Sequence, residues 1–114
     1  MQITRHAISR MGSRGITQQM IDLAYAYGID KGDKVIFTQR AAEFRLIEAK
    51  AEQKAIAKAM DNGVANLSAS MHLASRLALE VQALAKIIAK HGLVVVVCDN
   101  TLVTTYRYEP TRYH

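Results

Sequence analysis

The sequence predicts an α+β domain: an N-terminal helical hairpin packed on a small antiparallel sheet, with a long two-helix insert before a C-terminal β-hairpin. Three observations favour this class. Two short capped helical segments open the chain, two long amphipathic segments fill its middle, and β-branched runs lie before and after them. Elements segregated along the chain in this way are typical of α+β folds. A length of 114 residues fits one domain, with a core at 1–39 and 92–109 and the insert at 40–91.

Capping signals define the two N-terminal helices. Thr4 is a good N-cap for a short helix, and Gly15 is suited to the left-handed conformation that ends one. The arrangement repeats, because Thr17 precedes a second amphipathic segment that Gly28 ends. Isoleucines stand at the hydrophobic-staple positions of both helices. The second segment has no lysine or arginine, so we interpret the pair as a structural hairpin rather than a DNA-reading motif.

The middle of the chain predicts one strand and two long helices. After a turn at 29–33, β-branched and aromatic residues predict a strand at 34–39. Helices are expected at 40–60 and 66–91 because apolar residues recur there at three- and four-residue steps. The apolar stripe of the first helix consists of Ala41, Phe44, Ile47, Ala51, Ala55 and Met60. The second helix has apolar residues on more than one face, so partners are expected to cover it within the domain or across a homodimer.

The C-terminal part predicts a β-hairpin. The continuous apolar run at 93–98 is typical of a strand buried on both faces. Asp99 and Asn100 form a plausible two-residue turn. The strand at 101–108 alternates, with one side expected to carry Leu102, Thr104, Tyr106 and Tyr108. Pro110 is expected to end the pairing, and 111–114 to form a tail.

Composition limits the classes of function and location. The formal net charge of +5 suits a polyanionic partner such as nucleic acid. Cys98 is the single cysteine, which excludes an intramolecular disulfide and favours the cytoplasm. The four histidines do not form a ligand cluster, so we expect no metal and no cofactor. The start is not a signal peptide, and charges interrupt the most apolar region, so we expect no membrane partner.

The first helix carries the clearest functional pattern. His6, Arg10 and Arg14 are spaced four residues apart, so their side chains share one face of the helix. Such a column of cations is costly when it is unpaired and favourable when an anion lies over it. The sequence therefore predicts an anion-binding face.

Two stretches resemble a known family. They are T-R-H-A-I-S-R-M-G-S-R-G-I-T near the start and L-V-V-V-V-C-D-N-T-L-V-T-T-Y-R near the end. They resemble the opening and the last hairpin of the family catalogued as domain of unknown function 4258. Members of this family look like the RelE-like and barnase-like ribonuclease fold, which implies a toxin-type, metal-independent endoribonuclease and an acidic neutralising protein. This chain departs from the family pattern, because its insert at 40–91 replaces a short connection.

A ribonuclease of this kind needs a base, an acid and cationic donors around the phosphate. His6, Arg10 and Arg14 have the required chemistry, and Tyr106 and Arg107 are expected to complete the catalytic set from the last strand. Further contacts to RNA are expected from Lys34 and Thr104.

Two alternatives stay open. The column of His6, Arg10 and Arg14 has a structural alternative, in which the arginines pair with Asp22, Asp33 or Asp99. The whole chain also has a non-catalytic alternative. In it, the protein is an interaction domain that dimerises through the helices at 40–60 and 66–91, or binds an acidic partner through them.

Overall fold

A computed structural model describes residues 1–63 and 66–109 and confirms an α+β fold. The predicted tail at 111–114 and the predicted break at Pro110 lie outside the described residues. Within these described residues, four helices and five strands follow one another. In order they are β1 (Gln2–Ile3), α1 (Arg5–Arg14), α2 (Gln18–Tyr27), β2 (Ile29–Asp30), β3 (Lys34–Thr38), α3 (Gln39–Asp61), α4 (Leu67–Ala89), β4 (Gly92–Cys98) and β5 (Thr101–Arg107).

The caps that the sequence predicted define both N-terminal helices. The Thr4 side chain accepts a hydrogen bond from the Ala7 backbone N–H, and Gly15 ends α1 with a φ of 63°. The Thr17 side chain caps α2 in the same way, and Gly28 follows the last residue of that helix. These polar ends are satisfied within a few residues of sequence, which is why they were predictable.

The sheet is mixed rather than purely antiparallel, with the strand order β1–β5–β4–β3–β2. Its antiparallel centre consists of β3, β4 and β5, as expected from the two predicted strand regions. The two edge strands of the sheet differ from the prediction. Strand β1 pairs with β5 in parallel, and β2 lies in the predicted turn at 29–33 and pairs with β3.

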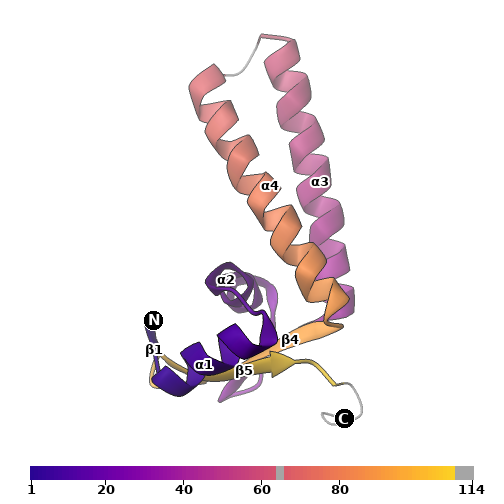
Figure 1. Cartoon of the computed structure of the whole chain (residues 1–114). Helices are drawn as coiled ribbons and strands as arrows, with labels where there is room; N and C mark the ends of the chain where they lie inside the picture. Colours follow the sequence, from indigo (N-terminus) through magenta and orange to yellow (C-terminus); the bar gives the residue numbers. More distant parts are fainter. Residues whose placement is uncertain (64–65, 110–114) are drawn as a thin grey trace.

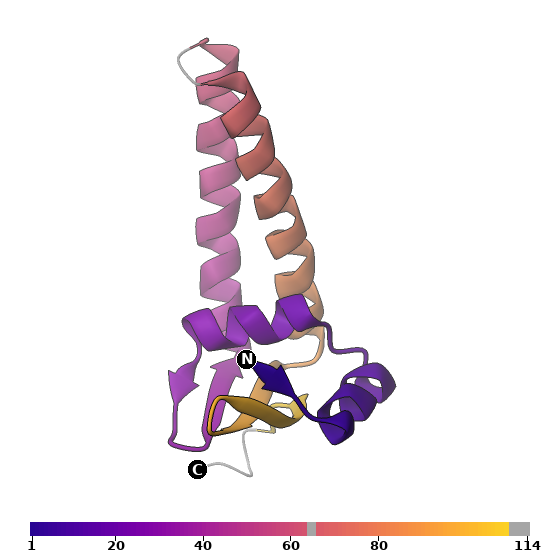
Figure 2. The ribbon, with the colours of Figure 1, turned by 90° about the vertical axis from the view of Figure 1, so that its left-hand side faces the viewer.

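The two N-terminal helices contact different parts of the sheet, which corrects the expected packed hairpin. Helix α2 packs on β3, β4 and α4, and its Met20 and Ile21 are fully buried in the core with Phe37. Helix α1 instead lies along β5 (Figures 1 and 2). The loop at 15–17 therefore carries the chain from the edge of the sheet onto its face.

A β-bulge changes the predicted faces of β5. Val97 pairs with Leu102, whereas Val96 pairs with Thr104, so Val103 is the extra residue. The predicted alternation is wrong across this point. Leu102 shares the core face with the fully buried Thr105, and residues 104 and 106 point to the opposite face.

The predicted insert is a pair of long antiparallel helices that projects away from the sheet (Figures 1 and 2). The molecule is accordingly elongated, with principal extents of 48 × 28 × 24 Å.

The structure corrects the predicted stripe of α3. Ala41 and Met60, at the ends of the predicted stripe, are half-buried, whereas Phe44, Ile47, Ala51 and Ala55 between them are exposed. The other buried or half-buried residues of α3 after Arg40 are Ala42, Arg45, Leu46, Ala49, Gln53, Ile56 and Ala59. In α4, Leu77, Leu84 and Ile87 are buried, but Leu67, Met71 and Leu73 are exposed.

Candidate functional site

Thr4 fixes the start of α1 to the last strand. Its backbone N–H donates a hydrogen bond to the Leu102 carbonyl at 3.1 Å. Its Oγ1 donates to the Val103 carbonyl at 3.2 Å while accepting from the Ala7 N–H at 3.1 Å. Both carbonyls belong to the residues at the bulge. Thr4 therefore caps the helix and attaches it to β5 at the point where the strand changes face.

The other end of α1 is held by two further contacts. The Arg14 Nη1 donates a hydrogen bond to the Thr105 carbonyl at 2.6 Å. The Lys90 Nζ donates to the Arg14 carbonyl at 2.8 Å, and so satisfies one of the free carbonyls at the end of the helix. Helix α1 is thus fastened at both ends along the edge of β5, and its exposed face has a defined orientation.

The predicted column of side chains exists on this face. His6, Arg10 and Arg14 are all exposed, and the Arg10 Nε donates to the His6 Nε2 at 3.4 Å. The His6 Nε2 is the acceptor of this hydrogen bond. The predicted structural alternative is not present in the described part of the chain, where neither arginine forms an ion pair with Asp22, Asp33 or Asp99. Arg14 does have a structural contact, but to a backbone carbonyl.

The bulge in β5 determines which strand residues face the column. Thr104 pairs with Val96 and Tyr106 with Val94, so these side chains lie on the face opposite the core. Lys34 of β3 also pairs with Val96 and lies on that same face. Without the extra residue at the bulge, Thr104 and Tyr106 would share the face of Leu102 and point into the core.

All of these side chains line one cleft of about 890 Å³. Seven of its lining residues are the ones that the sequence singled out: His6, Arg10, Arg14, Lys34, Thr104, Tyr106 and Arg107. They come from α1, β3 and β5, which are distant in sequence. The cleft also contains four residues that were not predicted, namely Ile16, Ala89, Lys90 and Glu109. Lys90 follows the helix α4 and Glu109 lies just after the strand β5. Only the tertiary fold brings the ends of α4 and β5 beside α1.

The electrostatic character of the cleft is strongly positive. Its described lining includes the cations Arg10, Arg14, Lys34, Lys90 and Arg107, against the single carboxylate of Glu109. An open concave surface of this composition favours an anion that carries several charges. In the described ranges 1–63 and 66–109, no group of three or more metal-ligating side chains is gathered.

A second hollow of about 520 Å³ continues from the cleft. It shares Arg107 and Glu109 with the cleft and adds Arg40, His91 and Tyr108. The His91 Nδ1 lies 3.2 Å from the Gln39 Oε1, and this contact orients the imidazole. Because Arg107 and Glu109 line both hollows, a ligand that extended from one hollow to the other would pass Arg107.

Comparisons with known proteins do not assign the chain to a family. No family model, no curated protein and no solved structure matches it. Among the described residues, no helix is both long enough and apolar enough to span a membrane. Function is therefore inferred from the geometry and charge of the cleft.

Proposed function

We propose that the protein is a RelE-like RNA-binding protein and a toxin-type, metal-independent endoribonuclease whose site is this cleft. One observation carries the proposal. Four segments that are far apart in sequence, namely α1, β3, the end of α4 and β5, contribute His6 and five cationic side chains to a single open cleft. Cations that line a concave surface attract the phosphates of a nucleic acid and hold its backbone.

The reaction needed is a transesterification within the RNA. The phosphoryl group is transferred from the 5′-oxygen of the next nucleotide to the neighbouring ribose 2′-oxygen. A base removes the 2′-hydroxyl proton, the 2′-oxygen attacks phosphorus, and the bond to the 5′-oxygen breaks as an acid supplies a proton to it. The products are a 2′,3′-cyclic phosphate and a free 5′-hydroxyl. His6 and Glu109 are the acid–base pair of the proposal, because an imidazole and a carboxylate can each take up or give a proton and both line the cleft.

The arginines and the strand residues have distinct roles in this scheme. Arg10 and Arg107 donate hydrogen bonds to the phosphate oxygens, where negative charge increases in the transition state. Arg14 adds positive charge while its Nη1 holds the Thr105 carbonyl. Lys34 and Thr104 contact the RNA backbone, and Tyr106, which also lines the cleft, carries a hydroxyl that is a further donor in this scheme.

Incubation of the purified protein with a single-stranded RNA oligonucleotide in EDTA tests the enzymatic part. Wild type is expected to produce fragments with 2′,3′-cyclic phosphate ends, and a 2′-deoxy substitution at the cleaved position is expected to block them. His6→Ala is expected to lower the rate by about 10²–10⁴-fold, the usual contribution of one general acid or base. Arg76→Gln, on the exposed surface of α4, is the control and should cleave like wild type. Absence of cleavage by wild type, or equal cleavage by His6→Ala, contradicts the catalytic role.

RNA binding is tested separately with an oligonucleotide of 2′-deoxy chemistry, which is not cleaved. Fluorescence anisotropy should show binding by wild type and by His6→Ala, and weaker binding by Arg10→Gln. An acidic neutralising protein, if it covers this cleft, would compete with the oligonucleotide for the same cations. No binding at low salt by wild type contradicts the RNA-binding part as well.

A second candidate function is protein–protein interaction through the insert without catalysis. It is favoured by the large apolar side chains that α3 and α4 expose, including Phe44, Ile47 and Met71. This candidate predicts a protein that associates but leaves RNA intact, so the cleavage assay distinguishes the two functions.

A further inference from the structure

The second hollow is built where three segments of the chain meet at Gly92. A Cβ on Gly92 would lie 2.7 Å from the Phe37 carbonyl oxygen, 3.0 Å from the Tyr108 Cβ and 3.1 Å from the Gln39 backbone nitrogen. Glycine therefore lets the start of α3 and the residues after β5 approach β4 closely. The Tyr108 backbone N–H also donates to the Gly92 carbonyl at 3.2 Å. The resulting hollow of about 520 Å³ has the size of a small-ligand pocket.

His91, which lines this hollow, has a backbone conformation that is uncommon for a residue with a side chain. It follows Lys90, the C-cap of α4, and its φ is 64°. Glycine is the usual residue in this left-handed conformation at a helix end, because it has no Cβ to oppose it. A histidine there carries a conformational cost that ending the helix does not require. This cost points to a role for the imidazole.

A chain of hydrogen bonds determines which ring nitrogen of His91 is a donor. The Gln39 Nε2 donates to the Glu43 Oε1 at 3.0 Å, so the amide oxygen is the atom that faces His91. That oxygen can only accept, so the His91 Nδ1, 3.2 Å away, donates to it. In the neutral imidazole, Nε2 is then an acceptor. Within the described part of the chain, no protein group donates to this Nε2.

Two arginines line the same hollow, and only one of them also lines the cleft. Arg107 is shared with the cleft, whereas Arg40, at the start of α3, is shared with a different hollow beside Tyr27 and Phe44. Both arginines are exposed, and within residues 1–63 and 66–109 neither forms an ion pair. Guanidinium groups of this kind are suited to phosphate oxygens.

We propose that the second hollow is the subsite for the nucleotide next to the cleaved phosphate, on the side of Arg107. Its base stacks on the Tyr108 ring and donates an N–H to the His91 Nε2, and Arg40 binds the phosphate beyond it. Every base has a π face and an N–H group, so the subsite requires a base but not a particular one. This inference rests on the proposed function in one respect, namely that the cleft holds the neighbouring phosphate. Because Arg40 belongs to the insert, the insert takes part in binding RNA.

Replacement of His91 by glycine separates the side chain from the backbone. His91→Gly keeps a residue suited to the left-handed φ, so its melting temperature should be at least that of wild type. Its affinity for an uncleavable 2′-deoxy octanucleotide, measured by fluorescence anisotropy, should nevertheless fall about threefold to tenfold, the contribution of one hydrogen bond.

Asn100→Gly is the matched control for this variant. Asn100 has a φ of 60° but lines neither the cleft nor the second hollow, so the control should bind like wild type. A His91→Gly that binds like wild type, or that unfolds at a lower temperature, overturns the role of His91 in the subsite.

An abasic strand separates the contact to the base from the contact to the phosphate. Wild type should bind the octanucleotide about tenfold more tightly than a strand of the same length that lacks all its bases. Tyr108→Ala should weaken binding of the first strand only, and Tyr108→Phe, which keeps the ring, should restore it. Arg40→Gln should weaken binding of both strands by the same factor. A Tyr108→Ala that affects the two strands equally overturns the base subsite.

The same measurements separate this inference from the proposed function. If binding shows these effects but wild type cleaves no RNA, the subsite stands and only the catalytic role of the cleft fails. If wild type cleaves RNA but His91→Gly, Tyr108→Ala and Arg40→Gln all bind like wild type, the function stands and the subsite fails. Absence of binding by wild type at low salt overturns both.

Discussion

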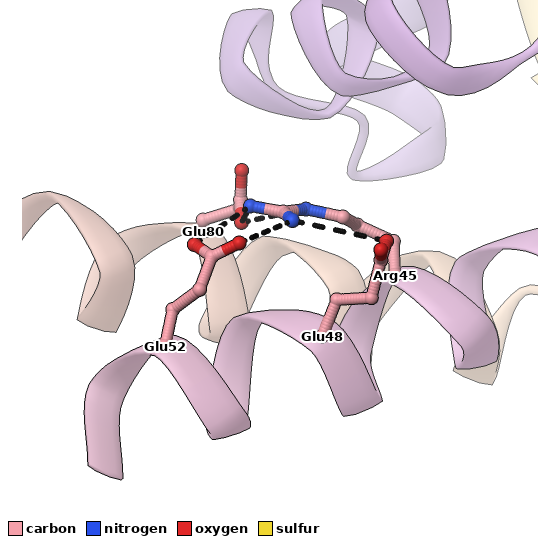
Figure 3. Close-up of polar contacts among 4 residues, drawn as sticks. All are labelled: Arg45, Glu48, Glu52 and Glu80. Atoms are coloured by element: carbon pink, nitrogen blue, oxygen red, sulfur yellow. Dashed lines mark hydrogen bonds and ion pairs between the residues drawn. The ribbon is translucent and has the colours of Figure 1, made fainter. Parts of the chain in front are cut away.

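The guanidinium of Arg45 joins the two helices of the insert through Glu80. The Arg45 Nη2 lies 2.7 Å from the Glu80 Oε2, and Nε donates to the same oxygen at 3.1 Å (Figure 3). Glu52 adds a contact of 3.0 Å to Nη1, and the Tyr27 ring lies 4.8 Å from the guanidinium carbon. Burial by itself lowers the pKa of Arg45, but the hydrogen bonds to Glu52 and Glu80 outweigh it and raise this pKa. Arg45 therefore stays charged at every pH at which the protein is handled.

Removing Arg45 should destabilise the insert more than removing a surface arginine. The side chain is only 11% exposed, so Arg45→Met leaves three glutamates facing one another without a cation. We expect the free energy of unfolding to fall by about 2 kcal/mol. Arg76→Met, at an exposed position of α4, should change it by less than about 0.5 kcal/mol. Urea titrations followed by circular dichroism compare the two, and equal losses would show that the cluster has no special importance.

The hydroxyl of Thr4 should matter for both stability and activity. Thr4→Val removes the cap on the Ala7 N–H and the hydrogen bond to the Val103 carbonyl, so a loss of about 1–2 kcal/mol is expected. RNA cleavage should fall too, because α1 then keeps only the backbone hydrogen bond to the Leu102 carbonyl at the bulge. Thr4→Ser keeps the hydroxyl and should behave like wild type in thermal unfolding and in the cleavage assay. If valine and serine give the same activity, the attachment does not position the column.

Sequence reasoning was most accurate where the signal is local. The caps at Thr4 and Thr17 satisfy backbone groups within their own helices, and the turn at Asp99 and Asn100 has the positive φ values that such short turns require. The extra residue at Val103 was missed, because a bulge depends on how two strands pair. The exposed face of α3 was taken for the buried one for a related reason. Phe44 and Ile47 are more apolar than Ala42 and Ala49, yet the small residues allow the close approach of α4.

The candidate site could likewise be predicted only where its pattern is local in the sequence. The spacing of His6, Arg10 and Arg14 indicated a shared helix face from the sequence alone, because helical periodicity is local. The convergence of Lys34 and Arg107 on that face depends on strand order and on the bulge, which no short motif encodes. Glu109 was not selected, because a lone carboxylate at the end of a strand has no distinguishing pattern.

Two glycines should respond to alanine in opposite directions. Gly12 lies within α1, and a Cβ there would meet no heavy atom within 4 Å. Gly12→Ala should therefore stabilise the protein by about 0.5–1 kcal/mol through the higher helix propensity of alanine. At Gly28 a Cβ would lie 2.7 Å from the Val35 Cγ1 and would also meet the Ala24 carbonyl, so Gly28→Ala should cost about 2 kcal/mol. Thermal unfolding measures both, and a stabilised Gly28→Ala would mean that α2 and β3 are not packed as described.

Arg107 should contribute to RNA binding through the phosphate and not through the base. It lies between the cleft and the second hollow, where a bound strand would pass from one to the other. Arg107→Gln should weaken binding of uncleavable oligonucleotides by a similar factor for every sequence tested. The slope of log affinity against log salt should fall by about 0.7, the value for one phosphate contact to a single strand. Anisotropy titrations across a salt series measure this slope, with Arg76→Gln as the control that keeps it unchanged. A loss of affinity confined to certain bases, with the slope unaltered, would instead assign Arg107 to base recognition.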